Sequence, residues 1–174
     1  MTIKSVGVVG ARQMGAGIAH VAALKGYDVV MHDVTPARIA TGLAPVRTPL
    51  ARQVSKDVID QKTMDAAMAR VTGSDSLDKI GQTDLAIEAA TENEEIKKSI
   101  FRALVPFCKD NTILASNTSS ISITRLASVT DRPDRFIGVH FMNPVPIMKL
   151  VEIIPGIATS KATYETAVEF AESL

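Results

Sequence analysis

Gly10-Ala11-Arg12-Gln13-Met14-Gly15 is the stretch of the sequence that decides the fold. It follows a short apolar run, Ser5–Val9, that predicts a buried strand, and it leads into a helical pattern over residues 13–25. A strand, a tight glycine turn and a helix in this order are typical of a dinucleotide-binding motif, because the free amides at the start of the helix attract a pyrophosphate. The alternative is a glycine turn that only joins a strand to a helix.

A carboxylate at a suitable distance favours the first interpretation. Asp33 lies 23 residues after Gly10, at the end of a second apolar run, Asp28–His32, that predicts another strand. There a carboxylate can accept hydrogen bonds from the adenosine ribose and repel a 2′-phosphate, so the sequence favours NAD as the cofactor. The candidate cofactor-binding residues of this region are Gly10, Arg12, Gln13, Met14, Gly15 and Asp33.

Arg12 departs from the motif, because a glycine in this place lets the backbone approach the diphosphate. A side chain there costs about 1–3 kcal/mol if the position needs an unusual backbone conformation, and a long side chain crowds the cofactor. The alternative is that the guanidinium group pairs with the phosphate charge. We expect weakened NAD binding.

The rest of the chain alternates short β-branched runs with longer helical patterns, which indicates βαβ units. We expect further strands at 85–88, 112–115, 136–140 and 150–154, and helices at 121–128 and 162–174. A capping box at 91–94 is expected to open a helix that extends to about residue 107. The fold class that follows is α/β, a doubly wound, mainly parallel sheet of the Rossmann type.

Residues 36–71 have a helical pattern with charged surfaces, which predicts two helices that project from the sheet after the second strand. Pro45 and Pro49 lie inside this pattern. Because proline removes an amide donor and clashes with the preceding turn, we expect a kink or a break between Gly42 and Leu50.

Length and composition limit the possible classes of protein. The 174 residues suit one domain, and 19 basic residues balance 19 acidic ones, which gives no electrostatic drive toward nucleic acid or an anionic membrane. The single cysteine, Cys108, excludes an internal disulfide framework. The sequence starts without a signal-peptide pattern and has no membrane-length apolar run, so a cytoplasmic or organelle-matrix location without membrane partners is expected. No residue is assigned to a metal.

Three polar segments, 88–93, 116–120 and 140–143, follow predicted strand ends and should gather at the carboxyl edge of the sheet. His140 suits a base for a hydroxyl proton, because the ordinary pKa of histidine lies near neutrality. Glu152 lies in an apolar run, where a carboxylate is costly to bury without a partner, and pairing with His140 would fix the imidazole tautomer. A histidine at a strand end is more often structural, and a glutamate in a strand is usually solvated, so the residues alone leave both roles open.

Several blocks in order carry a resemblance to a known family. They are Gly10-Ala11-x-x-Met14-Gly15-x-Gly17-Ile18-Ala19, Ile87-Glu88-Ala89-Ala90-x-Glu92-Asn93, Ser116-Asn117-Thr118-Ser119-Ser120, Gly138-Val139-His140-Phe141-Met142-Asn143-Pro144-Val145-Pro146 and Met148-Lys149-Leu150-Val151-Glu152. Together they resemble the N-terminal NAD-binding domain of the 3-hydroxyacyl-CoA dehydrogenases, which include bacterial 3-hydroxybutyryl-CoA dehydrogenases. The resemblance covers nearly the whole chain, and it implies oxidation of a (3S)-3-hydroxyacyl-CoA to the 3-oxoacyl-CoA with NAD, or the reverse, in fatty acid metabolism.

The resemblance also implies roles for individual residues. His140 is implied to be the general base, Glu152 its orienting partner, Ser119 a hydrogen-bond partner of the substrate 3-oxygen, and Asn143 a wall of the same pocket. For Ser119, local turn or cap bonding is the alternative.

Two further residues are implied to bind the cofactor. Glu92 and Lys97 correspond to family residues that contact it around the ribose and nicotinamide end. For Glu92 the alternative is stabilisation of a helix dipole. The family's projecting helical segment takes part in CoA binding, but Pro45 and Pro49 put that geometry in doubt here, and we name no CoA-binding residue.

The family's chains continue with a helical domain that carries most of a dimer interface, whereas this sequence ends at Leu174. We therefore expect a truncated domain, residues 1–174, with an acyl-CoA substrate, little or no turnover alone, and a homo-oligomeric state only in the full-length family. One rival is a non-catalytic NAD-binding or interaction module. Another is a related dehydrogenase for a small hydroxy acid or sugar acid, which usually has a catalytic lysine, so that the His140–Glu152 pair argues against it.

Overall fold

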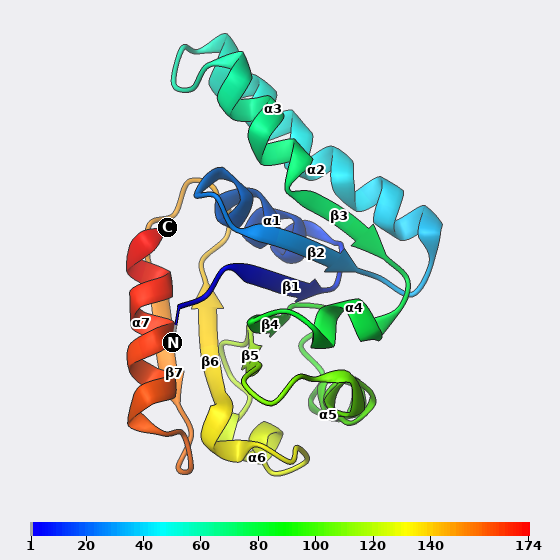
Figure 1. The fold of residues 1–174 in the computed structure, drawn as a ribbon, viewed down its shortest axis with the longest axis vertical. Coiled ribbons are helices and arrows are strands. Elements are labelled where there is room, and N and C mark those ends of the chain that lie inside the picture. Colours follow the sequence, from blue (N-terminus) through cyan, green and yellow to red (C-terminus); the bar gives the residue numbers. More distant parts are fainter. Residues whose placement is uncertain (1) are drawn as a thin grey trace.

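A seven-stranded sheet organises residues 2–174, the part of the chain that the computed structural model describes (Figure 1). Its strands lie in the order β3-β2-β1-β4-β5-β6-β7, with β1–β6 parallel and β7 antiparallel to β6. The reversal of strand order between β1 and β4 is that of a doubly wound sheet, which confirms the predicted Rossmann-type fold. The strands are β1 (Ser5–Val9), β2 (Asp28–His32), β3 (Val71–Ser74), β4 (Leu85–Glu88), β5 (Ile113–Ser116), β6 (Phe136–Phe141) and β7 (Val151–Pro155).

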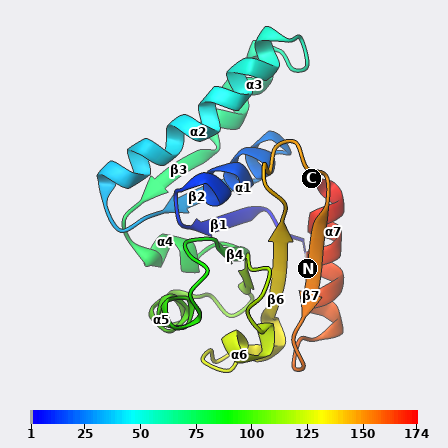
Figure 2. The same cartoon turned by 180° about the vertical axis from the view of Figure 1, so that it is seen from behind.

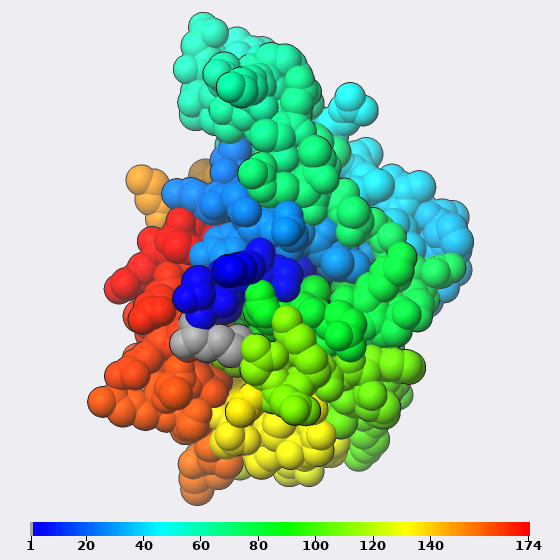
Figure 3. All heavy atoms as spheres, in the orientation of Figure 1, coloured from blue at the N-terminus to red at the C-terminus, as the bar shows by residue number. Residues whose placement is uncertain are grey.

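Helices cover both faces of the sheet. Buried residues of α1 and α7 form one apolar cluster with one face of the strands, and residues of α4, α5 and α6 form a second cluster on the opposite face. The α2–α3 hairpin lies across α1 and projects beyond the sheet (Figures 1 and 2), and Figure 3 shows it standing out from the rest of the surface. The helices are α1 (Gln13–Leu24), α2 (Pro36–Ser55), α3 (Gln61–Ala69), α4 (Leu77–Gly81), α5 (Glu94–Leu104), α6 (Ile123–Ala127) and α7 (Lys161–Ser173), with short 3₁₀ turns η1 (Val105–Phe107) and η2 (Pro133–Arg135). None of the helices within residues 2–174 combines the length and the apolar character that crossing a membrane requires.

The turn between β1 and α1 depends on two glycines. Gly10 has a φ of +105°, a conformation that side-chain-bearing residues rarely adopt. A Cβ atom on Gly15 would lie 1.8 Å from the carbonyl oxygen of Gly10. The two glycines therefore allow α1 to start directly behind the end of β1.

Helix α2 is continuous from Pro36 to Ser55, so of the expected kink or break between Gly42 and Leu50 the break is wrong. Pro45 and Pro49 lie four residues apart on one side of the helix, where Pro45 is exposed and Pro49 is half-buried. The adjacent side is buried at helical spacing, and that burial outweighs the amide donors that the prolines lack. The buried residues of α2 are Ile39, Gly42, Val46 and Leu50.

Some element boundaries also differ from the prediction. Helix α5 begins at Glu94, and its N-cap is Asn93, whose side chain accepts a hydrogen bond from the amide of Ile96 at 3.0 Å. The predicted capping box, which puts the N-cap two residues earlier at Thr91, is therefore wrong. The α-helix ends at Leu104 and continues as the 3₁₀ turn η1. The edge strand β3 and the short helix α4 were not predicted, because neither has a clear apolar period in the sequence.

Asp84 holds β1 and β4 together at the amino edge of the sheet. Its carboxylate accepts hydrogen bonds from the backbone amides of Lys4 and Ser5 at 2.9 and 3.0 Å, and the Nζ of Lys109 lies 2.6 Å away. Burial acts to raise the pKa of Asp84, but these hydrogen bonds outweigh it and lower the pKa to about 2. The charged carboxylate is thus more stable in the folded chain than in the unfolded one.

Asp84→Asn is expected to lower the free energy of unfolding by about 2 kcal/mol at pH 7. Since the pKa is depressed on folding, this contribution is present above about pH 4 and is lost as the pH falls toward about 2. Urea unfolding at pH 7 and pH 3 measures it, with the exposed Glu169→Gln as a control that changes neither value. A difference between Asp84→Asn and the unaltered protein that is the same at both pH values would contradict the assignment.

Candidate active site

The carboxyl ends of β1, β4 and β5 enclose a crevice at the point where the strand order reverses. The strand ladder continues past the strands, because the amide of Ala89 donates to the carbonyl of Val9 and the amide of Asn117 donates to the carbonyl of Glu88, both at 2.8 Å. In open α/β sheets such a reversal is where ligands bind. The crevice has a volume of about 360 Å³ and is lined by Arg12, Gln13, Met14, Ala89, Ala90, Thr91, Glu92 and Asn117.

Asp33 lies beside the glycine turn, as predicted. Its Oδ2 accepts a hydrogen bond from the amide of Ala11 at 3.0 Å, and its Oδ1 accepts one from the amide of Val34 at 2.8 Å. Burial acts to raise the pKa of Asp33, but these amides and the nearby charge of Arg38 outweigh it and lower the pKa. A fixed, charged carboxylate at this place suits the hydroxyls of an adenosine ribose.

Arg12 is the N-cap of α1 and has φ −83° and ψ −168°, which is ordinary extended backbone. The conformational cost considered for a non-glycine residue at this position is therefore absent. The side chain is exposed and lines the crevice. Of the two reasons to expect weakened NAD binding, only crowding of a bound diphosphate by the long side chain remains.

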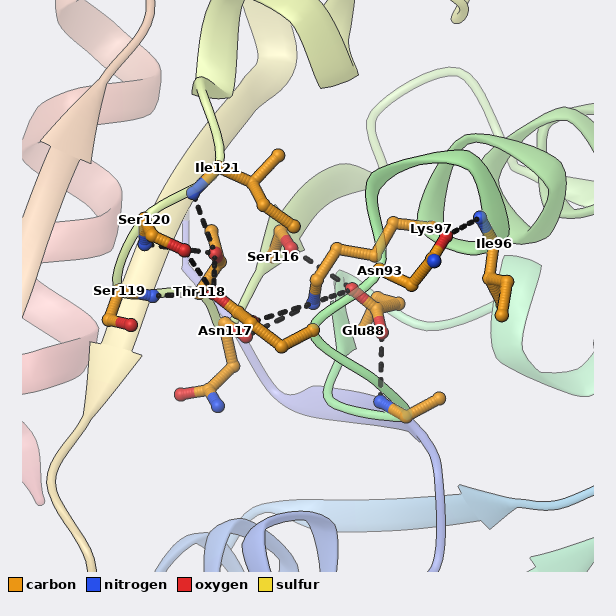
Figure 4. Close-up of polar contacts among 12 residues, drawn as sticks. Glu88, Asn93, Ile96, Lys97, Ser116, Asn117, Thr118, Ser119, Ser120 and Ile121 are labelled. Atoms are coloured by element: carbon orange, nitrogen blue, oxygen red, sulfur yellow. Dashed lines mark hydrogen bonds and ion pairs between the residues drawn. The ribbon is translucent and has the colours of Figure 1, made fainter.

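Glu88 and Lys97 form a fully buried ion pair behind the crevice (Figure 4). The Nζ of Lys97 lies 2.5 Å from the Oε2 of Glu88 and 3.1 Å from the carbonyl oxygen of Asn117. Glu88 also accepts hydrogen bonds from the amide of Ala90 at 2.8 Å and from the hydroxyl of Ser116 at 3.0 Å. The pair thus joins the ends of β4 and β5 to α5.

This geometry corrects the role that the resemblance implied for Lys97. Its side chain has no exposed surface, so it cannot contact a ligand in the crevice as expected. Sequence reasoning also missed Glu88 as a member of the site. The available signal was a carboxylate in the apolar strand Leu85–Glu88, which requires a buried partner.

Glu92 connects the crevice to the loop after β5. Its Oε1 accepts hydrogen bonds from the hydroxyls of Thr118 and Ser120 at 2.5 and 3.0 Å, and from the amide of Ser119 at 3.2 Å. Burial acts to raise the pKa of Glu92, but these hydrogen bonds and the charge of Lys97 outweigh it and lower the pKa. Because Glu92 precedes the N-cap of α5, it lies outside the helix, and its contacts are with the loop rather than with the helix dipole.

His140 and Glu152 lie directly opposite each other on the antiparallel strands β6 and β7. The Nδ1 of His140 is 2.7 Å from the Oε2 of Glu152, so the predicted pairing is present. Half of the Glu152 side chain is exposed, so this carboxylate is only partly buried beside its predicted partner. The strand register, rather than burial, brings the two together.

Ser119 and Asn143 occupy different parts of the edge. Ser119 is exposed, and Figure 4 shows its side chain directed away from the buried pair. Local capping is not its role, because the N-cap of α6 is Ser122. Asn143 accepts a hydrogen bond from the side-chain amide of Gln13 at 3.0 Å, which joins the loop after β6 to the start of α1.

A second, mostly apolar cleft of about 820 Å³ lies between α2 and the loop that follows β6. Asn143 and Gln13 line the end of this cleft that is near the glycine turn. The basic side chains of Arg52, in α2, and Lys56, at the C-terminal end of α2, also line the cleft. Pro45 and Pro49, which sequence reasoning treated only as helix breakers, contribute to the apolar wall. Within residues 2–174, no group of three or more histidine, cysteine, aspartate or glutamate side chains is arranged to hold a metal ion.

Comparison with known proteins gives one consistent family. Residues 5–174 match the family described as "3-hydroxyacyl-CoA dehydrogenase, NAD binding domain". The chain is 55% identical over 172 residues to a 3-hydroxybutyryl-CoA dehydrogenase of Bradyrhizobium diazoefficiens, and the aligned part covers 99% of this chain and 59% of the relative. It is 41% identical over 181 residues to the mitochondrial hydroxyacyl-coenzyme A dehydrogenase of Rattus norvegicus, and the aligned part covers 99% of this chain and 57% of the relative.

A solved structure agrees with these relatives. The crystal structure of (S)-3-hydroxybutyryl-CoA dehydrogenase from Ralstonia eutropha has a TM-score of 0.96 and 46% sequence identity, over 99% of this chain and 61% of that one. The chain therefore spans between 57% and 61% of the length of these three relatives.

Proposed function

The chain belongs to the 3-hydroxyacyl-CoA dehydrogenase family and corresponds to its NAD-binding domain. From this premise we propose that it supplies the cofactor site and the catalytic base for the oxidation of (3S)-3-hydroxyacyl-CoA to 3-oxoacyl-CoA. The observation that carries the proposal is the His140–Glu152 pair at the sheet edge that also holds the glycine turn. Residues 1–174 form one NAD-binding domain in this proposal. NAD, the cofactor of the family, accepts the hydride from C3 of the substrate when it is bound.

His140 handles the proton of the 3-hydroxyl group. Because a carboxylate only accepts hydrogen bonds, Glu152 keeps the proton of the imidazole on Nδ1. The Nε2 atom is then free to take the substrate proton, and the nearby negative charge stabilises the imidazolium ion that forms. The hydroxyl of Ser119 donates a hydrogen bond to the 3-oxygen of the substrate, and Asn143 shapes the same pocket.

The residues that would hold the cofactor line the crevice. Gly10 and Gly15 allow the diphosphate to reach the first amides of α1, with Gln13 and Met14 as neighbouring walls. Asp33 accepts hydrogen bonds from the adenosine ribose at one end. Glu92 would bind the cofactor at the other end, around the ribose of the nicotinamide. The buried Lys97 positions Glu92 and Asn117 rather than touching the cofactor.

The acyl-CoA substrate occupies the cleft between α2 and the loop after β6. Its apolar wall suits an acyl and pantetheine chain, and Arg52 and Lys56 supply positive charge for phosphate groups. A short acyl chain is supported by the names of the relatives, which act on 3-hydroxybutyryl-CoA.

The test is NADH oxidation with acetoacetyl-CoA, compared with free acetoacetate. It is run on residues 1–174 and on a chimera in which the remaining part of the Bradyrhizobium relative follows this chain. In the chimera we expect turnover of the thioester and none of the free acid, and in residues 1–174 alone we expect little or no turnover of either compound. Tight NADH binding with no turnover of either compound in the chimera would support a non-catalytic module, and preference for the free acid would support a hydroxy-acid dehydrogenase.

Arg12→Gly is expected to bind NADH more tightly than the unaltered protein, by roughly tenfold or less, which corresponds to at most about 1.4 kcal/mol. The reason is crowding of the diphosphate by the guanidinium side chain, because the backbone conformation of Arg12 carries no strain. Titration of NADH into both proteins at fixed ionic strength measures the difference. Equal affinities would show that the side chain is neutral, and weaker binding by Arg12→Gly would show that it pairs with the phosphates.

A further inference from the structure

Asn117, directly after β5, is held by three hydrogen bonds to three different elements. Its amide donates to the carbonyl of Glu88 at 2.8 Å, and its carbonyl oxygen accepts from the buried Nζ of Lys97 at 3.1 Å. Its side-chain Oδ1 accepts from the amide of Phe141 at 2.9 Å. β4, α5 and β6 therefore fix both the backbone and the side chain of this residue.

These contacts determine which way the side-chain amide faces. A backbone N–H is only a donor, so the atom opposite Phe141 must be the oxygen, and the Nδ2 group points the other way. Figure 4 shows the end of the side chain directed away from the Glu88–Lys97 pair. Asn117 also lines the crevice, and none of the hydrogen bonds found within residues 2–174 uses its Nδ2. A fixed donor is thus left without a partner at the cofactor crevice.

The strand order indicates which part of the cofactor this donor meets. Asp33 follows β2, on one side of β1, whereas Asn117 follows β5, on the other side of β1 and beyond β4. With the adenosine at Asp33 and the diphosphate at the glycine turn, the dinucleotide continues toward β5 with its nicotinamide half. The hydrogen-bond acceptors that this nicotinamide half offers to a donor of the protein are the oxygens of its ribose and of its carboxamide group.

We propose that Asn117 is a cofactor-positioning residue whose Nδ2 group donates a hydrogen bond to an oxygen of the nicotinamide riboside. The inference rests on the proposed NAD site. The same side chain holds the amide of Phe141, the residue next to His140. One amide group therefore fixes both the nicotinamide half of the cofactor and the strand end that carries the proposed base.

Two substitutions separate the contact with the cofactor from the contact with Phe141. Asn117→Asp keeps an oxygen for the amide of Phe141 but replaces the donor by an acceptor. Asn117→Ala removes both groups without adding a charge. The affinities to measure are those for NADH and for ADP, which contains the adenosine and the diphosphate but no nicotinamide riboside.

In both variants we expect the loss of affinity for NADH to exceed the loss for ADP by about tenfold, the effect of one unsatisfied polar contact. If Asn117→Asp restores the NADH affinity of the unaltered protein, Asn117 is only an anchor for Phe141 and the proposal fails. Equal losses for NADH and ADP in both variants would also overturn it. If the unaltered protein does not bind NADH, the proposed function itself fails, so the two failures are distinguishable.

Discussion

Gly15→Ala is expected to abolish NADH binding and to lower the free energy of unfolding by more than about 4 kcal/mol. The added Cβ atom would lie 1.8 Å from the carbonyl oxygen of Gly10 and 2.9 Å from its carbonyl carbon. Both neighbours are backbone atoms of a turn that itself has a positive φ, so neither can move aside as a flexible side chain would. The start of α1 must move away from β1, and the amides that face the crevice move with it.

Gly26→Ala is the matched control, because it places the same methyl group at the other end of α1. Nothing lies within 4 Å of a Cβ atom on Gly26, although its φ of +94° makes a side chain unfavourable there. We expect a loss of about 1–2 kcal/mol in stability and an unchanged affinity for NADH. Urea unfolding and NADH fluorescence titration measure both quantities. NADH affinity that survives Gly15→Ala would mean that the glycine turn does not hold the diphosphate.

Local sequence patterns were sufficient to predict most of the fold. β1, β2 and β4 have the predicted boundaries, because each is a short, mostly apolar run that ends at a turn or at a polar residue. Pro45 and Pro49 misled the prediction for α2 because the burial that keeps the helix continuous comes from α1, which is distant in the sequence. The edge strand β3 has two exposed residues and gains its structure from pairing with β2.

The site could be predicted where chemistry alone restricts a residue, but not where tertiary contacts decide its role. His140 and Glu152 were paired correctly from the residue types and the resemblance, whereas the antiparallel register that brings them together is a property of the sheet. The burial of Lys97 and the orientation of the Asn117 amide follow from partners 9 to 24 residues away, which no local pattern specifies.

His140→Gln is expected to lower the rate of acetoacetyl-CoA reduction by roughly 10²- to 10⁴-fold, the usual contribution of a positioned acid or base. Glutamine keeps a polar side chain at the end of β6 but cannot exchange a proton with the substrate. The affinity for NADH should change by less than about twofold, since His140 does not line the cofactor crevice. Single-turnover rates and NADH titration, in the chimera described above, separate the two quantities. A rate within threefold of the unaltered protein would remove His140 from the mechanism.

Glu152→Gln provides the decisive comparison, because Glu152 acts on the reaction only through the imidazole that it contacts at 2.7 Å. Alone, it should reduce the rate less than His140→Gln does, since the base is still present but is no longer held in one tautomer by a negative charge. Combined with His140→Gln, it should reduce the rate no further, because residues that act as a unit are not additive. A double variant whose loss equals the product of the two single losses would show that the carboxylate acts independently, and the pair would then not be the catalytic unit that the sheet register suggests.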